Sequence, residues 1–270
     1  MEREKRATQL QFVKLGGSLI TDKTEPYTPR RRVIGRLAGE VRAALDADPG
    51  LRLLLGHGSG SFGHWAARPY GTREGVRTAA QWRGYAEVAA AAGRLNRIVT
   101  DTFLEAGVPV LSLQPSASVR CNDGEVRHLS VEPIRAALGH GLVPLVYGDV
   151  ALDEVRGGTI ASTEDLFVYL AGALRPARVL LLGRVAGVLD DEGEVISRIG
   201  PESHQRWQDV FSGACGVDVT GGMGDKVARM IELVRRHPET RVRILAGTEP
   251  GLLTRVLLGD ERGIGTAIAR

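Results

Sequence analysis

Short apolar runs alternate with amphipathic helical patterns along most of the chain. A strand that is buried on both faces reads as a nearly continuous apolar run, as parallel strands covered by helices do. Such runs predict strands at Leu10–Leu15, Leu51–Leu55, Val108–Leu113, Leu142–Tyr147, Val179–Leu182 and Val242–Leu245, a short strand at Val126–Leu129, and a final edge strand at Thr266–Ile268.

Helices are predicted between these strands, where apolar residues recur at three- or four-residue spacing. The pattern from Thr78 to Ala106 is the longest, and its length leaves a break near Gly93 open. Ser162 followed by Asp165 resembles a capping box and predicts the start of another helix. The remaining helical patterns cover Val33–Leu45, Val131–Leu138 (closed by Gly139), Val227–Val234 and Leu252–Leu258.

Strands that alternate with helices imply parallel pairing and a doubly wound α/β sheet. A hairpin is predicted in addition, from two short apolar runs on either side of Gly157-Gly158. In a doubly wound fold, ligands bind at the carboxyl ends of the strands. That edge would hold Lys14, Gly58, Gly148 and Gly183.

Composition narrows the class of protein. The chain has 270 residues, 43% of them hydrophobic and 25% charged, which suits one soluble α/β domain. The net charge of +3 argues against a nucleic-acid-binding surface, and no apolar run approaches the roughly 20 residues that span a membrane. Cys121 and Cys215 form no disulfide framework and match no metal spacing. Because the charged N-terminal stretch also lacks a signal-type apolar region, we expect a cytoplasmic protein with reduced thiols.

The candidate chemistry centres on the stretch from Gly56 to His64, which follows the second predicted strand. Its four glycines let the backbone turn tightly, and successive N–H groups in such a turn can bind an anion. His64 closes the predicted loop with a side chain that can donate a hydrogen bond. A second glycine stretch, Gly16-Gly17-Ser18, follows the first strand. The stretch from Gly56 to His64 therefore predicts a phosphate-binding loop, with a glycine-rich surface turn as the alternative.

Two common nucleotide-binding patterns are disfavoured. Gly58 to Gly63 fits the G-x-G-x-x-G fingerprint, but no strand ending in an acid follows near position 80. The G-x-x-x-x-G-K-[ST] loop is absent. Lys14 and Lys226, two of only four lysines in the chain, would instead clamp a phosphoryl group in transfer. Such transfer needs positioning and charge rather than covalent chemistry.

Five motifs resemble the amino acid kinase superfamily, and most closely its isopentenyl phosphate kinase branch. They are Lys14-Leu-Gly-Gly-Ser18, His57-Gly-Ser-Gly-Ser-Phe-Gly-His64, Gly148-Asp149, Ser162-Thr-Glu-Asp165, and Asp218-Val-Thr-Gly-Gly-Met223 with Lys226. The final histidine, His64, is typical of this branch and of the related fosfomycin kinases. The resemblance covers about Leu10 to Leu258, which is nearly the whole chain.

The resemblance implies a single three-layer αβα sandwich with a mainly parallel central sheet, usually in a homodimer. An N-terminal lobe, about residues 8–147, would bind the acceptor, and a C-terminal lobe, about residues 148–270, would bind the nucleotide. The implied reaction transfers the γ-phosphate of ATP to isopentenyl monophosphate, with Mg²⁺ bridging the ATP phosphates. These small molecules would be the partners, without nucleic acid or membrane. Alternatives are a kinase for another phosphate or phosphonate, such as fosfomycin, and a non-catalytic sensor.

The resemblance also implies the site residues. Catalysis would rest on Lys14, Lys226 and His64, with Glu164 or Asp165 orienting the lysines. ATP would contact Lys14, Gly16, Gly17, Ser18, Lys23, Gly183, Gly224 and Lys226. The acceptor would contact Gly58, Ser59, Gly60, His64, Gly148 and Thr163. No metal ligand is assigned, because Mg²⁺ often keeps several of its waters.

The chain departs from the family pattern at two positions. Ser59 replaces the middle glycine of a triplet that is typical of the family, and it retains the backbone N–H at that position. Glu164 replaces an aspartate of the family pattern. The longer side chain leaves open whether Glu164 or Asp165 orients the lysines. Also open are a structural or catalytic His57, a core or prenyl-pocket role for Trp82, Tyr85 and Val88, and a nucleotide-binding or loop-capping role for Asp149 and Asp190.

Overall fold

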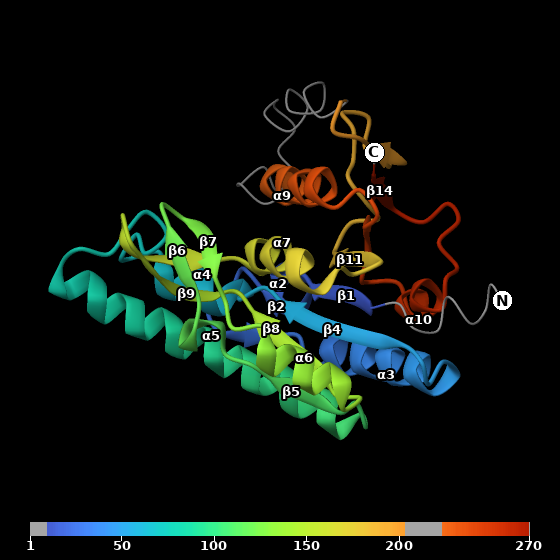
Figure 1. Cartoon of the computed structure of the whole chain (residues 1–270), viewed down its shortest axis with the longest axis horizontal. Coiled ribbons are helices and arrows are strands. Elements are labelled where there is room, and N and C mark those ends of the chain that lie inside the picture. Colours follow the sequence, from blue (N-terminus) through green and yellow to red (C-terminus); the bar gives the residue numbers. More distant parts are fainter. Residues whose placement is uncertain (1–9, 203–222, 270) are drawn as a thin grey trace.

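A computed structural model describes residues 10–202 and 223–269 of the chain, and its centre is an eight-stranded sheet (Figure 1). Its strands are β1 (Leu10–Leu15), β4 (Arg52–His57), β5 (Val110–Ser112), β8 (Val143–Tyr147), β11 (Arg178–Gly183), β12 (Arg198–Ile199), β13 (Arg241–Ala246) and β14 (Thr266–Ile268). They lie in the order β12-β14-β13-β11-β1-β4-β8-β5. Neighbours from β13 to β5 pair in parallel, whereas β14 is antiparallel to β13.

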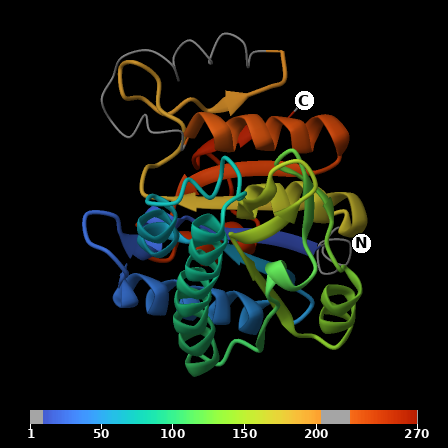
Figure 2. The ribbon, with the colours of Figure 1, turned by 90° about the vertical axis from the view of Figure 1, so that its left-hand side faces the viewer.

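Helices cover both faces of this sheet. They include α3 (Arg31–Ala47), α5 (Ala79–Glu105), α6 (Glu132–Gly139), α7 (Thr163–Leu174), α9 (Met223–Arg236) and α10 (Leu252–Leu257). Buried residues of α3, α5 and α10 form one apolar core with the sheet, and those of α6, α7 and α9 form a second. Accordingly, α9 and α3 lie on opposite sides of the molecule in Figure 2. The three-layer αβα sandwich is confirmed.

Strand β1 shows how the sequence builds this arrangement. Val13 and Leu15 belong to the first core, and Leu10 and Phe12 belong to the second. Successive side chains on a strand point to opposite faces of the sheet. Lys14 therefore shares the face of Leu10 and Phe12, which is the face that α7 and α9 cover.

Short strands outside the central sheet account for most of what the apolar pattern missed. A four-stranded sheet has the order β10-β9-β6-β7. Its members are β6 (Arg120–Asn122), β7 (Glu125–His128), β9 (Asp149–Asp153) and β10 (Gly157–Ala161). The predicted hairpin is confirmed as the antiparallel pair β9–β10, and the short strand after residue 125 is β7. A two-stranded sheet pairs β2 (Thr21–Asp22) with β3 (Thr28–Pro29).

Two predictions about the borders of elements need correction. The strand Thr266–Ile268 is not the edge strand of the sheet, because β12 pairs with its outer side. The sequence shows no sign of β12, since a strand of two residues is too short to show an apolar pattern. Gly139 is the last residue of α6, as predicted, but the left-handed glycine that follows the helix is Gly141, with φ of 73°. The question about Gly93 is also answered, since α5 runs unbroken for 27 residues.

Some predictions fall outside the described residues. They concern the charged N-terminal stretch, Cys215, and the part of the fifth motif that precedes Met223. Cys121 is described, and it is buried, which raises the pKa of its thiol to about 11. Within the described ranges, no helix has both the length and the apolar character that crossing a membrane requires.

Candidate functional site

The two glycine stretches pack directly against each other at the carboxyl ends of β1 and β4. A Cβ atom on Gly17 would lie 2.6 Å from the backbone nitrogen of Gly60, and one on Gly58 would lie 2.9 Å from the nitrogen of Gly17. Gly60 has a φ of 52°, which disfavours any other residue. Gly58 N also donates to the carbonyl of Leu15 at 3.0 Å. The two stretches are therefore in direct backbone contact, which leaves no room for a side chain at Gly17, Gly58 or Gly60.

His64 lies on a helix rather than at the end of a loop, which corrects the sequence prediction. β4 continues through His57, and α4 (Gly60–Ala67) begins soon after it. The Thr21 hydroxyl donates to Gly17 O at 2.7 Å and accepts from Ser61 N at 2.9 Å. This hydroxyl joins the start of α4 to α2 (Gly17–Ile20), the short helix of the first glycine stretch. The exposed His64 side chain is thereby carried on a fixed helix.

A cleft of about 760 Å³ lies where these elements meet. Ten of the predicted site residues line it, although they come from distant parts of the chain. They are Lys14, Gly17, Ser18, Lys23, Gly58, Ser59, Gly60, His64, Glu164 and Lys226. The other six do not line it, namely Gly16, Gly148, Thr163, Asp165, Gly183 and Gly224.

Lys14 and Glu164 form a buried ion pair in this cleft. The Lys14 Nζ atom lies 2.5 Å from Glu164 Oε1, and the two side chains are 6% and 8% exposed. Burial alone would raise the pKa of Glu164, but the charge and the hydrogen bond of Lys14, together with the charge of Lys226, hold that pKa below its ordinary value. Glu164 is therefore an ionised carboxylate that fixes the position of the Lys14 ammonium.

Asp165 has different partners, which answers the question left open between the two acids. It completes the predicted capping box, since its Oδ2 accepts from Ser162 N at 3.0 Å and from Ser162 Oγ at 2.6 Å. Its Oδ1 lies 2.8 Å from Arg229 Nε of α9. Of the two acids, Glu164 contacts Lys14, and Asp165 holds the start of α7 against α9.

Other predicted site residues belong to the framework beneath the cleft. The Thr163 hydroxyl is buried and donates to His57 O at 2.7 Å, and Gly148 N donates to the same carbonyl at 3.1 Å. Gly16 N donates to Leu182 O at 2.9 Å, and Gly183 O accepts from Gly247 N at 2.8 Å. These contacts hold β1, β4, α7 and β11 together below the cleft.

Asp149 and Asp190 cap loops in the structure. Asp149 is buried, and its carboxylate accepts from Ser116 N at 3.1 Å and from Val150 N at 2.9 Å. Asp190 accepts from the backbone of Glu192 and Glu194. Both carboxylates are therefore engaged within the chain.

The residues considered for a prenyl pocket do not behave alike. Val88 is a core residue at 2% exposure, whereas Trp82 is 39% exposed. Tyr85 is half-buried, packs against the core, and contacts Trp82 with a ring-centroid distance of 5.3 Å. The core interpretation is thus confirmed for Val88 and wrong for Trp82.

His57 is buried and has a structural environment. Because Gly58 O can only accept, His57 Nδ1 carries the proton at 3.1 Å, and Nε2 accepts from Asn96 Nδ2 at 3.2 Å. The ring stacks on Tyr147 with a centroid distance of 5.5 Å. Burial, followed by the charge of Lys14, lowers the pKa of His57 to about 4.

The neutral His57 predicts a dependence of stability on pH. We expect the lowered pKa of His57 to reduce the free energy of unfolding by about 3 kcal/mol as pH falls from about 6.5 to about 4. Within this window the unfolded chain binds more protons than the folded one, so stability rises with pH. Urea unfolding across the window measures the slope, and His57→Gln should flatten it. An unchanged slope in that variant would contradict the expectation.

Three arginines line the cleft, Arg68, Arg73 and Arg229, and the sequence interpretation missed all three. Arg73 and Arg229 are the two that make ion pairs there. Arg229 lies on α9, and Arg73 lies on the segment that follows α4. Arginine is so common in this chain that neither position stands out from composition, and neither belongs to a motif. Only the folded structure brings them to Lys14 and Glu164.

Comparison with known proteins gives one consistent family. The model of the amino acid kinase family matches residues 9–245. The isopentenyl phosphate kinase of Methanocaldococcus jannaschii is 33% identical over 260 residues, which is 94% of this chain and 97% of that protein. The isopentenyl phosphate kinase of Haloferax volcanii is 37% identical over 91% of this chain and 98% of its own length. A solved isopentenyl phosphate kinase structure superimposes with a TM-score of 0.80 at 30% identity, over 96% of this chain and all of its own. With its glycine stretches and its lysine–glutamate pair in one cleft, the chain belongs to the amino acid kinase family.

Proposed function

We propose that the protein transfers the γ-phosphate of ATP directly to isopentenyl monophosphate, giving isopentenyl diphosphate and ADP. The observation that carries this proposal is the buried Lys14–Glu164 pair, which faces the glycine stretches and His64 across one cleft. The similarity to isopentenyl phosphate kinases over nearly the whole chain supports the choice of acceptor.

The acceptor phosphate supplies its own nucleophile. A phosphate monoester has a second pKa of about 6 and is therefore an anion near neutral pH. One of its oxygens forms the new bond to the γ-phosphorus, and the bond from that phosphorus to the ADP oxygen breaks. No general base is needed, so His64 acts as a hydrogen-bond donor to the acceptor phosphate. The amides of Ser59 and Gly60, at the start of α4, lie where helix geometry favours an anion.

The lysines stabilise the charge on the phosphoryl group in transfer. Glu164 holds Lys14 at a fixed place, so its ammonium needs no reorganisation when charge develops. Lys226 lies near the start of α9, far from Lys14 in the sequence, and it lines the same cleft. On the nucleotide side, Gly17, Ser18 and Lys23 line the cleft and would contact the ATP phosphates.

Magnesium enters this proposal only through ATP. Bound to the phosphates, Mg²⁺ would neutralise part of their charge. In the part of the chain that the structure describes, no group of three or more histidine, cysteine or acidic residues could hold a metal ion. Glu164 is occupied by Lys14 and Asp225 faces Arg73. The described residues therefore do not provide a protein cage for Mg²⁺, and no step is assigned to it.

The organisation of the chain is proposed from the same resemblance. β1, β4, β5 and β8 occupy one half of the central sheet, and β11 to β14 occupy the other. This division suits an acceptor lobe over about residues 8–147 and a nucleotide lobe over about residues 148–270. A homodimer in the cytoplasm completes the proposal, supported by the family resemblance and the two cysteines without a disulfide framework.

The proposed function is tested by ATP consumption with a panel of acceptors. The panel contains isopentenyl phosphate, dimethylallyl phosphate, fosfomycin, acetylglutamate and uridylate. We expect the highest kcat/KM with isopentenyl phosphate. A preference for fosfomycin would favour a phosphonate kinase, and activity on acetylglutamate alone would overturn the reading of His64. No turnover with any acceptor would favour a sensor, which the retained Lys14–Glu164 pair argues against.

Within this assay, His64→Ala is expected to lower turnover of isopentenyl phosphate by about 10²-fold or more, the scale for losing one oriented donor. His64→Gln retains an N–H donor and should lose less. His140→Ala removes another exposed imidazole, at the end of α6, and serves as the matched control. Near-normal turnover in His64→Ala would contradict the donor role.

A further inference from the structure

The segment between α4 and α5 holds the backbone of Arg73 at the edge of the cleft. Arg73 O accepts from Thr159 Oγ1 at 3.0 Å and from Arg156 Nη1 at 3.3 Å. Val76 N donates to Arg156 O at 2.8 Å. Thr159 belongs to β10, and Arg156 lies in the turn before it. The β9–β10 hairpin therefore anchors the main chain on which the Arg73 side chain is mounted.

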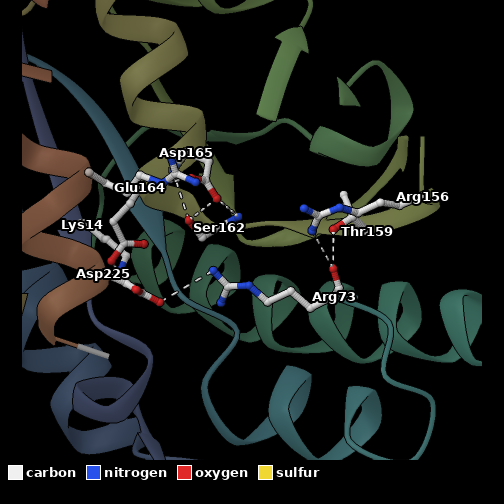
Figure 3. Close-up of polar contacts among 9 residues, drawn as sticks. Lys14, Arg73, Arg156, Thr159, Ser162, Glu164, Asp165 and Asp225 are labelled. Atoms are coloured by element: carbon white, nitrogen blue, oxygen red, sulfur yellow. Dashed lines mark hydrogen bonds and ion pairs between the residues drawn. The ribbon is translucent and has the colours of Figure 1, made fainter. Parts of the chain in front are cut away.

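The Arg73 side chain extends from this anchor into the cleft. Figure 3 shows it pointing toward Asp225, on the side where Lys14 and Glu164 lie. Its Nη2 atom is 3.9 Å from Asp225 Oδ2, and the two side chains are 58% and 65% exposed. Asp225 directly precedes Lys226 on α9. The guanidinium thus lies between the acceptor side of the cleft and the helix that carries Lys226.

This ion pair is long and solvated, so little is lost when it breaks. Exposed pairs contribute weakly to stability, because water screens them and both side chains lose freedom. A guanidinium that meets a phosphate can form two parallel charge-assisted hydrogen bonds, which are considerably stronger. Arg229, the other cleft arginine that makes an ion pair, is already bound to Asp165 at 2.8 Å and to Glu232 at 3.1 Å. Arg73 is the more easily recruited of the two.

We propose that Arg73 exchanges Asp225 for phosphate oxygens when ATP and the acceptor are bound. This inference rests on the proposed function, because it assumes two phosphorylated ligands in the cleft. In that complex the guanidinium binds the phosphates where donor and acceptor meet, and Asp225 competes for it in the empty cleft. Arg73 is then a further residue that positions the reacting phosphates, in addition to Lys14, Lys226 and His64.

A purely structural role predicts different behaviour. If the pair only joined the segment after α4 to α9, removing either partner would have the same effect. Exchanging the two residues would also restore the link. If Arg73 binds phosphate, the two partners act in opposite directions, and the exchanged pair places a carboxylate where the phosphates must bind.

The test compares variants of the two partners in the ATP-consumption assay with isopentenyl phosphate. Arg73→Ala is expected to lower kcat/KM by about 10- to 100-fold, less than for an enclosed donor because Arg73 is exposed. Arg73→Lys keeps the charge but not the paired donors and should lie between. Asp225→Asn should lower KM by about two- to fivefold, the factor that matches loss of one exposed ion pair.

Two further variants separate the explanations. The double variant Arg73→Asp with Asp225→Arg is expected to stay as impaired as Arg73→Ala. Arg77→Ala, an exposed arginine on the same segment that does not line the cleft, is the matched control and should match the wild type.

Equal losses in Arg73→Ala and Asp225→Asn, or recovery in the exchanged variant, would overturn the proposal in favour of a structural link. Wild-type kinetics in Arg73→Ala would also overturn it while leaving the proposed function intact. An inactive wild type would instead contradict the proposed function and this inference with it.

Discussion

Lys14→Met is expected to lower kcat/KM for isopentenyl phosphate by about 10²- to 10³-fold while the fold is retained. Methionine fills a similar volume in the buried site but has no charge to place on the transferred phosphoryl group. The Glu164 carboxylate, without its partner, would take up a proton rather than remain a buried lone charge. Steady-state ATP consumption measures the loss, and circular dichroism confirms the fold.

Lys23→Met provides the matched control for this variant. Lys23 also lines the cleft, but it is exposed and lies in the turn between β2 and β3. A solvated ammonium is replaced by water and salt more easily than an enclosed one, so a smaller loss is expected. If Lys14→Met kept its kcat/KM within a few fold, the role of Lys14 in phosphoryl transfer would be wrong.

Glu164→Gln is expected to lower the free energy of unfolding by about 3 kcal/mol, because it leaves the buried Lys14 ammonium without a counter-charge. The double variant Lys14→Met with Glu164→Gln removes both charges and should recover most of that stability. Urea unfolding of the wild type, both single variants and the double variant gives the coupling energy between the two residues.

Glu105→Gln, at the exposed end of α5, controls for the loss of one carboxylate and should change stability little. A small effect of Glu164→Gln, or a double variant less stable than both single ones, would mean that the pair is not a buried unit. Measuring activity as well separates the role of the pair in stability from its role in catalysis, since the double variant should recover stability but not turnover.

The sequence predicts the framework of this site well where local pattern and tertiary structure agree. The apolar run of β1 places Lys14 in a buried strand, and the strand period sets the face on which it lies. The spacing from Ser162 to Asp165 predicts the start of α7, and the capping box there leaves Glu164 free for Lys14. In both cases a short sequence pattern predicts where a side chain of the site lies.

Other parts of the site depend on contacts that no local pattern reveals. The run Gly60 to Ala67 contains two glycines and reads as a loop, yet it forms α4, since tertiary contacts such as that of the Thr21 hydroxyl outweigh weak helix propensity. Thr163 lies within a recognisable motif, but its hydroxyl donates a hydrogen bond to His57 O and so belongs to the framework below the cleft. Arg73 reaches the cleft only because β10 and its turn hold the segment around it.

The close packing of the two glycine stretches also has a consequence for protein engineering. Because Gly17 and Gly60 touch backbone to backbone, a library that randomises either stretch alone would mostly yield chains that cannot close this junction. Redesign of acceptor preference is better begun at the segment between α4 and α5, where side chains rather than bare backbone border the cleft. The two glycine stretches therefore behave as one structural unit, and changes to the cleft are best made around it.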